Sequence, residues 1–151
     1  TGFDVKLLIR DFETFLGYDN VNEAVLVGAG LLGRSLLQYK GFSAYGLHLV
    51  AAFDRDPALT ELRFNGEQKI FPMEKLEDLC RRMRIHIGII CVPEASAQVV
   101  CDRLVACGIR AIWNFAPAHL TVPDGILVQN ENIASSLAVL SAHLQDHYSE
   151  K

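Results

Sequence analysis

The sequence lacks two features that would assign it to a membrane protein or to a nucleic-acid-binding module. It has no apolar run approaching the length of a membrane span, and no signal peptide opens the chain, so we expect no membrane association. It also lacks an excess of basic charge, because 14 lysine and arginine residues stand against 18 aspartate and glutamate residues, for a net charge of −4. Since neutralising phosphates requires a basic face, this charge argues against the chain itself binding duplex DNA.

The sequence also lacks any cysteine pattern typical of metal binding. None of its four cysteines forms a C-x-x-C pair, and no histidine stands at metal-ligand spacing from them, so we expect neither a zinc site nor a disulfide framework. Free thiols are typical of a reducing compartment, which predicts a cytoplasmic protein. The four cysteines are Cys80, Cys91, Cys101 and Cys107.

What is present fits one globular α/β domain. The chain has 151 residues, of which 50% are hydrophobic and 21% are charged, enough to bury a core. It begins at Thr1 without an initiator methionine, and we expect that a segment preceded it. Asp4 can cap a first helix that Gly17 ends. That helix carries an apolar stripe of Val5, Leu8, Ile9, Phe12 and Leu16, which must cover a sheet face, a sheet edge or a partner.

The central motif is a glycine-rich turn between a buried strand at 24–27 and a helix that continues through 34–39. Its glycines have the G-x-G-x-x-G spacing of dinucleotide-binding turns. Gly28 permits the tight turn, Gly30 lets backbone N–H groups approach a pyrophosphate, and Gly33 lets the helix pack closely on the strand. The predicted pyrophosphate site comprises Gly28, Ala29, Gly30, Leu31, Leu32 and Gly33.

An acidic residue follows the second predicted strand at the place where such turns require one. The apolar run 49–53 ends in Asp54, roughly twenty residues past the last glycine, where a carboxylate binds the adenosine ribose. Asp54 should repel a 2′-phosphate, which favours NAD over NADP. Arg55 could stack on the adenine or be a solvated surface residue. The alternative for the whole motif is a βαβ unit whose turn only happens to be rich in glycine.

The remainder of the chain alternates strand and helix patterns. We expect strands at 85–92, 110–114 and 126–129, with a helix over 95–107 after the first of them. This alternation predicts a Rossmann-type doubly wound fold with a mostly parallel sheet, in which ligands bind at the carboxyl ends of the strands. Residues 39–46, with two glycines and three aromatics, are expected to form an ordered surface loop near that crevice.

A terminal helix with its own apolar stripe is expected after the last strand. Its stripe needs a surface to bury it, and a second copy of the chain is one natural candidate. We therefore divide the chain into a nucleotide-binding domain at 1–131 and a dimerisation helix at 132–151. The stripe comprises Ile133, Leu137, Leu140 and Leu144.

Seven segments of the chain together carry a family resemblance: 1–5, 28–33, 39–42, 53–57, 89–93, 113–117 and 130–132. In this order they closely resemble the NAD(H)-binding domain of the Rex family of redox-sensing transcriptional repressors. The resemblance implies a homodimer that exchanges its C-terminal helices, and a winged-helix DNA-binding domain upstream that is absent here. It also implies that NADH favours a closed dimer that releases operator DNA, whereas NAD is compatible with DNA binding.

The same resemblance assigns further residues to the site. It places the Asn-Phe-Ala loop beside the nicotinamide half, Tyr39 in the redox switch, and Ile133 near the nicotinamide. Rex proteins usually have an aspartate where this chain has Asn132, followed by an apolar residue that is often phenylalanine. The departure removes a charge from the expected tyrosine contact. The cofactor-binding residues expected beyond the glycine turn are Tyr39, Asp54, Arg55, Cys91, Val92, Pro93, Asn114, Phe115, Ala116 and Ile133.

The residues themselves also argue against an enzyme. A dehydrogenase needs a substrate domain and a catalytic acid or base, whereas only one helix follows the last predicted strand here. No histidine pairs with a carboxylate in the sequence pattern. The alternatives are a CoA- or nucleotide-binding domain of an enzyme and a fragment of a dehydrogenase.

Overall fold

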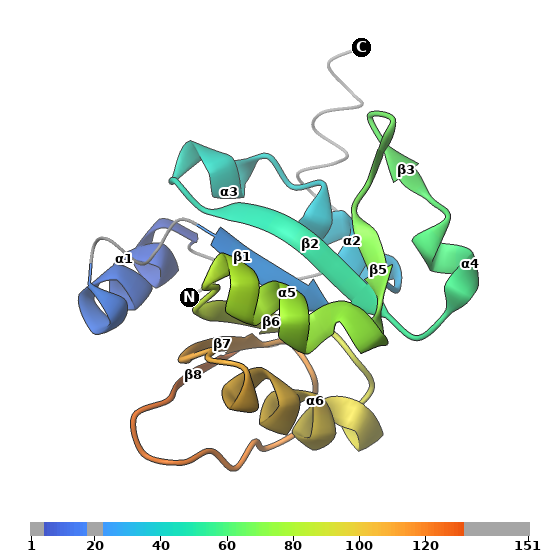
Figure 1. The fold of residues 1–151 in the computed structure, drawn as a ribbon. Helices are drawn as coiled ribbons and strands as arrows, with labels where there is room; N and C mark the ends of the chain where they lie inside the picture. Colours follow the sequence, from blue (N-terminus) through green and yellow to red (C-terminus); the bar gives the residue numbers. More distant parts are fainter. Residues whose placement is uncertain (1–4, 18–22, 132–151) are drawn as a thin grey trace.

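Six parallel strands form the centre of the protein in the computed structural model, which describes residues 5–17 and 23–131 (Figure 1). Their order is β5-β2-β1-β6-β7-β8, so the chain builds outward from β1 in one direction and then in the other. This is the doubly wound Rossmann order, and it confirms the predicted fold class. The strands are β1 (Glu23–Val27), β2 (His48–Asp54), β5 (Ile70–Pro72), β6 (Ile87–Ile90), β7 (Ala111–Asn114) and β8 (Leu127–Asn130).

The inner strands are buried on both faces, which explains why their sequences are continuous apolar runs. In the register of the sheet, Leu26 of β1 stands between Ala52 of β2 and Ile89 of β6. All three side chains are fully buried. Such strands need helices on both sides of the sheet, because each face presents its own row of apolar side chains.

Helices cover the two faces in separate groups (Figure 1). α1 (Val5–Leu16), α2 (Leu31–Leu37) and α3 (Gly41–Ala44) share one hydrophobic core with the sheet. α5 (Leu76–Met83) and α6 (Glu94–Ala106) share a second core on the opposite face. Strand residues alternate between the cores, since Leu26 belongs to the first and Val25 and Val27 belong to the second. The remaining elements are short: α4 (Pro57–Thr60), the 3-10 helix η2 (Met73–Lys75), and the hairpin of β3 (Arg63–Phe64) and β4 (Glu67–Gln68).

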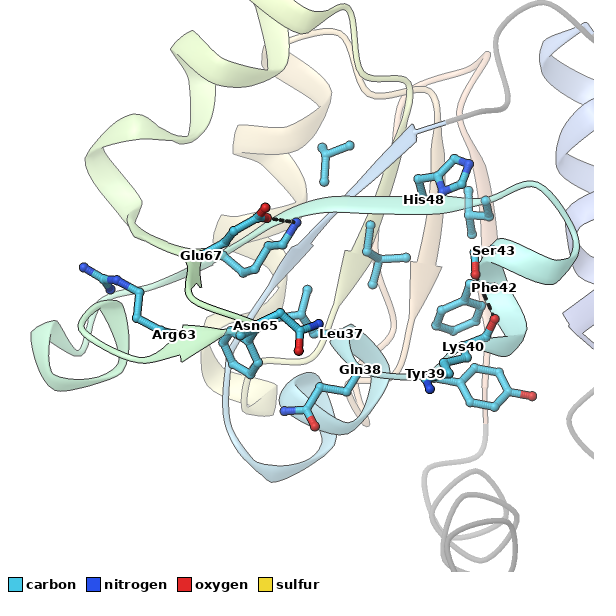
Figure 2. Close-up of a pocket in the computed structure, with 15 residues that line it drawn as sticks. Leu37, Gln38, Tyr39, Lys40, Phe42, Ser43, His48, Arg63, Asn65 and Glu67 are labelled. Carbon is cyan, nitrogen blue, oxygen red and sulfur yellow. Dashed lines mark hydrogen bonds and ion pairs between the residues drawn. The ribbon is translucent and has the colours of Figure 1, made fainter. Parts of the chain in front are cut away.

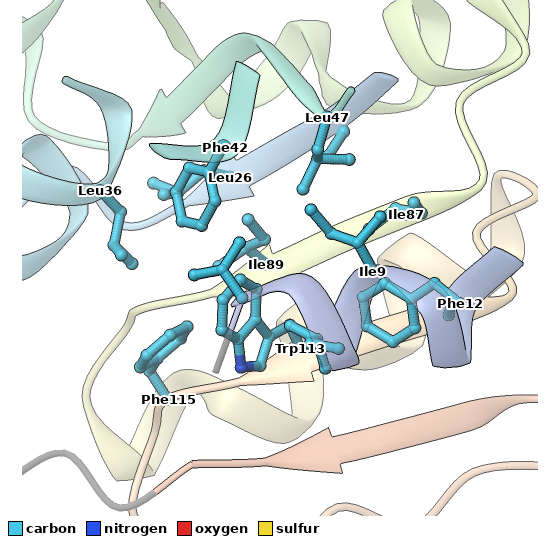
Figure 3. Close-up of a cluster of buried hydrophobic side chains, with 14 of the residues drawn as sticks. Ile9, Phe12, Leu26, Leu36, Phe42, Leu47, Ile87, Ile89, Trp113 and Phe115 are labelled. Carbon is cyan, nitrogen blue, oxygen red and sulfur yellow. The ribbon is translucent and has the colours of Figure 1, made fainter. Parts of the chain in front are cut away.

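The first helix has the predicted stripe and buries it against the sheet. Every stripe residue of α1 is buried in the first core, and in Figure 3 Ile9 and Phe12 lie beside Ile87 and Trp113. Gly17 ends the helix with φ of 86°, and its N–H donates to the Glu13 carbonyl at 2.8 Å. Of the three surfaces considered for this stripe, the sheet face is therefore the one it covers.

The segment 39–46 differs from its prediction as an ordered loop near the crevice. It contains α3, whose Phe42 is buried in the first core, and the Leu47 N–H donates to the Phe42 carbonyl at 2.9 Å. Burial of the Phe42 ring fixes the segment over the beginning of β2 rather than at its carboxyl end. The predicted terminal helix, including Asn132 and Ile133, lies outside the described residues.

None of the helices within residues 5–17 and 23–131 combines the length and apolar character that crossing a bilayer demands.

Candidate functional site

Backbone hydrogen bonds bring the predicted site segments together at the carboxyl ends of four adjacent strands. The Gly28 N–H donates to the Phe53 carbonyl at 2.8 Å, which joins the glycine turn to the end of β2. The Cys91 N–H donates to the Val27 carbonyl at 2.8 Å, and the Phe115 N–H donates to the Ile90 carbonyl at 2.9 Å. We call this region the nucleotide edge; it comprises 28–33, Asp54, 91–93 and 114–116.

Two of the three motif glycines are required by close backbone contacts. Gly28 has φ of 103°, and a Cβ atom there would lie 2.5 Å from the Cys91 carbonyl oxygen. A Cβ atom at Gly33 would collide with the Gly28 carbonyl, and it would also lie 3.2 Å from the Leu26 side chain. These contacts match the predicted roles of a tight turn at Gly28 and close packing of helix on strand at Gly33.

Gly30 has a different environment, because it faces open space. It is exposed, and a Cβ atom built on it would have no atom within 4 Å. Leu31 follows with 74% of its surface exposed, whereas Leu32 is half-buried against the first core. No contact within residues 5–17 and 23–131 requires glycine at position 30. A glycine without such a contact is expected where a ligand approaches the backbone closely.

Asp54 ties the end of β2 to the glycine turn. Its Oδ2 accepts from the Ala29 N–H at 2.7 Å, and its Oδ1 accepts from the Asp56 N–H at 2.9 Å. In the part of the chain that the structure describes, no cation pairs with this carboxylate. Each oxygen retains a lone pair for a ribose hydroxyl. Arg55 beside it is exposed, and no side-chain partner holds it within the described ranges.

Arg34 is a residue of this region that the sequence analysis missed. Its Nη1 donates to the Ala29 carbonyl at 2.8 Å, so a second charged side chain holds the glycine turn. The available signal was a basic residue directly after the last glycine of the motif. The sequence pattern does not show that the Arg34 side chain turns back over the glycine turn, so this contact is visible only in the folded structure.

The loop after β6 supplies the segment 91–93. Cys91 is half-buried, and its carbonyl group packs against Gly28, where it leaves no room for a Cβ atom. Burial raises the pKa of the Cys91 thiol well above its usual range, which favours the protonated thiol over the nucleophilic thiolate. Val92 is half-buried beside it, and the exposed Pro93 is the N-cap residue that precedes α6.

Asn114 shapes the loop after β7 from within. It is fully buried, and its Oδ1 accepts from the Ala116 N–H at 3.0 Å. Its Nδ2 donates to the Ala118 carbonyl at 3.1 Å and to Asn130 Oδ1 at 3.0 Å. The side chain therefore holds Phe115 and Ala116 in place at the nucleotide edge, with its own amide atoms already engaged.

Tyr39 is separated from the nucleotide edge but is connected to it by packed aromatic rings. Tyr39 and Phe42 meet edge to face with ring centroids 4.9 Å apart, and Phe42 meets Trp113 at 5.6 Å. The ring centroids of Trp113 and Phe115 are 4.9 Å apart. Figure 3 shows both residues. Gly41 is needed here, because a Cβ atom at this position would collide with the Tyr39 ring.

A cavity in the described part of the chain adjoins Tyr39 and not the nucleotide edge (Figure 2). Its volume is about 830 Å³, and its walls come from the end of α2, from α3, from the start of β2 and from the β3–β4 hairpin. A salt bridge between Lys69 and Glu67 at 3.3 Å lies in its wall. Tyr39 is the one predicted cofactor residue among its described lining residues, so this cavity is distinct from the predicted nucleotide site.

The cysteines lie apart from the nucleotide edge, with the exception of Cys91. All four cysteines are free, and three of them lie in the second core. Across residues 5–17 and 23–131, no group of three potential metal ligands comes together.

Comparison with protein families and curated proteins gives two consistent matches. A family model described as a CoA binding domain matches residues 19–118. The redox-sensing transcriptional repressor Rex of Bacteroides fragilis is 42% identical over 142 residues, and that of Clostridium beijerinckii is 41% identical over 139 residues. These matches cover 92% of this chain but 63% and 65% of the relatives, so the chain spans less than two thirds of their length.

Solved structures give the same result at higher coverage. A Rex-family repressor called RSP superposes with a TM-score of 0.72 and 36% identity, over 97% of this chain and 70% of that one. Further structures of RSP are complexes with β-NADH and with β-NAD+ and operator DNA. The relatives are named as repressors, which is the non-enzymatic class that the sequence predicted. The chain therefore contains a domain of the CoA-binding family and belongs to the Rex family of redox-sensing transcriptional repressors.

Proposed function

We propose that this chain is the NADH- and NAD-sensing domain of a transcriptional repressor. The observation that carries the proposal is the contact between Asp54 and the Ala29 N–H, which joins a ribose-binding carboxylate to a glycine turn that faces open space at Gly30. The residues present fit a dinucleotide, because one end of the edge offers a carboxylate and the other offers unhindered backbone N–H groups. RSP, a relative, is known in complex with both nicotinamide dinucleotides.

In this proposal each segment of the nucleotide edge contacts a different part of the dinucleotide. Gly28 through Gly33 hold the pyrophosphate, and Asp54 and Arg55 hold the adenosine end. Cys91, Val92 and Pro93 form the floor, while Asn114, Phe115 and Ala116 border the nicotinamide. Tyr39 senses the redox state through the switch, together with Ile133 of a second copy.

The proposal includes a homodimer. Residues 1–131 form the nucleotide-binding domain, and residues 132–151 form a helix that packs on the partner subunit. NADH favours a closed dimer that releases operator DNA, and NAD is compatible with DNA binding. Operator contacts belong to a domain in the part of the relatives that this chain does not span. The proposed location is the cytoplasm, where the nucleotide pool is found. A reducing compartment also suits the four free cysteines.

Calorimetric titration of the chain with NADH and with CoA tests the nucleotide proposal. We expect saturable binding of NADH with one site per chain and no competition from CoA. NADPH should bind more weakly than NADH, because Asp54 repels a 2′-phosphate. Tight binding of CoA without binding of NADH would instead support the alternative of a CoA-binding enzyme domain.

Sedimentation velocity tests the dimer. The intact chain should sediment as a dimer, and a variant ending at Glu131 should sediment as a monomer with weaker NADH binding. A well-folded monomer of the intact chain, with NADH affinity untouched by the deletion, would contradict both the dimer and the switch.

A further inference from the structure

Both backbone groups of Ala29 are held by charged side chains from different elements. The N–H donates to Asp54 Oδ2 at 2.7 Å, and the carbonyl accepts from Arg34 Nη1 at 2.8 Å. The Asp54 carboxylate accepts from the electropositive N–H, and the Arg34 guanidinium donates to the electronegative carbonyl oxygen, so both contacts are favourable. Ala29 itself is fully buried, which excludes water as a competing partner.

The Arg34 contact has a consequence for the next residue. A peptide unit is planar and trans, so fixing the Ala29 carbonyl also fixes the direction of the Gly30 N–H on the opposite side of the same unit. Gly30 is exposed and has no atom within 4 Å of the position a Cβ would take. Its N–H is therefore set in direction by Arg34 at the place where a pyrophosphate approaches.

Arg34 has capacity beyond this single bond. A guanidinium group carries five N–H donors, and the Ala29 carbonyl occupies one of them. Within the described ranges the side chain has no further hydrogen bond or ion pair, and it is half-buried. Its charge is positive, as the neighbourhood of a pyrophosphate requires.

We propose that Arg34 is a positioning residue of the nucleotide site, which orients the Gly30 N–H and makes binding selective for nucleotides that carry a pyrophosphate. The inference rests on the proposed function. Asp54 then binds the adenosine ribose, and Arg34 orients the Gly30 N–H toward the phosphates. The Ala29 backbone links the two.

Three ligands separate this role from a purely structural one. Arg34→Met removes the donor and the charge while keeping an unbranched stem, and Arg34→Lys keeps both the donor and the charge. NADH and ADP are measured by calorimetry, and adenosine, which lacks phosphates, is measured by NMR titration. Arg82→Met, at an exposed position on α5, is the matched control.

We expect Arg34→Met to weaken NADH and ADP about tenfold, as the loss of one charged hydrogen bond implies, and to leave adenosine affinity unchanged. Arg34→Lys should recover most of the loss, and Arg82→Met should match the wild type. Thermal unfolding of each variant checks the fold. Should Arg34→Met fail to fold, Arg34→Gln carries the same test.

Two results would overturn the inference while leaving the proposed function intact. One is NADH and ADP affinities of Arg34→Met within twofold of wild type. The other is an equal loss for adenosine, which would mean that Arg34 only supports the fold of the loop. A wild-type chain that binds neither NADH nor ADP would overturn the proposed function as well.

Discussion

Asp54 at the nucleotide edge and Glu77 on the α5–α6 face are two carboxylates in one domain with opposite surroundings. Among the described residues, Asp54 accepts hydrogen bonds from two backbone N–H groups, those of Ala29 and Asp56, and from no side chain. Glu77 receives both Nε and Nη2 of Arg103, the latter at 2.9 Å, which joins α5 to α6. The first carboxylate keeps binding capacity for a ligand, whereas the second is committed to the fold. Substitutions at the nucleotide edge should therefore change the affinity for NADH, and substitutions on the α5–α6 face should change the stability of the fold.

The largest effect should come from Gly30→Val at the nucleotide edge. A Cβ atom at this position meets no atom of the described residues within 4 Å, so stability should change little, whereas the side chain would occupy the space that we propose for the pyrophosphate. We expect NADH affinity to fall by about a hundredfold or more, since this loses several favourable contacts. Calorimetry and thermal unfolding measure the two quantities.

Gly28→Val is the matched variant within the same turn. It should unfold the protein, because a Cβ there lies 2.5 Å from the Cys91 carbonyl oxygen and φ is 103°. Equal stability of the two valine variants would contradict the distinction between the two glycines.

Asp54→Ala should have the next largest effect. It removes a charged acceptor from the adenosine end, and NADH affinity should fall about ten- to hundredfold. Discrimination against NADPH should relax, because the charge that repels a 2′-phosphate is gone. Asp78→Ala, at an exposed aspartate paired with Arg82, is the control. An unchanged preference between NADH and NADPH would remove Asp54 from the ribose role.

Glu77→Gln should show the reverse pattern. The free energy of unfolding should fall by about 1 kcal/mol, because the ion pair is bidentate but partly open to water. NADH affinity should stay at the wild-type value. Denaturant unfolding measures the free energy of unfolding, and calorimetry measures the affinity for NADH. A loss of NADH affinity equal to that of Asp54→Ala would contradict the difference between the two carboxylates.

The smallest effect concerns pH. The Arg103 guanidinium holds the pKa of Glu77 below its ordinary value of 4.5. A lowered folded-state pKa contributes stability that is full above 4.5 and is lost as pH falls through the folded value. Wild type should therefore lose stability over this acidic range more steeply than Glu77→Gln. Identical slopes in unfolding experiments across that range would contradict the prediction.

The sequence predicted the frame of the protein because the frame follows from local patterns. Continuous apolar runs marked β1 and β6, and the three glycines followed by Asp54 marked the nucleotide edge.

What the sequence did not reveal depends on contacts between distant residues. α3 was read as a loop because the burial of Phe42 under the first core leaves no periodic signal. Arg34 was missed because only the folded loop shows its reach to Ala29. Asn114 was assigned to the nicotinamide by resemblance, and its engagement with Asn130 becomes visible only when β7 and β8 are paired.

The most direct test of the nucleotide edge uses the single tryptophan of the chain. Trp113 is 1% exposed, and its ring lies 4.9 Å from that of Phe115 in the loop at this edge. NADH bound there should accept excitation energy from Trp113, so titration should give nicotinamide emission on tryptophan excitation. The emission should saturate with one NADH per chain and disappear in Gly30→Val. Binding without energy transfer, or full transfer in Gly30→Val, would contradict the assignment of the nucleotide site to this edge.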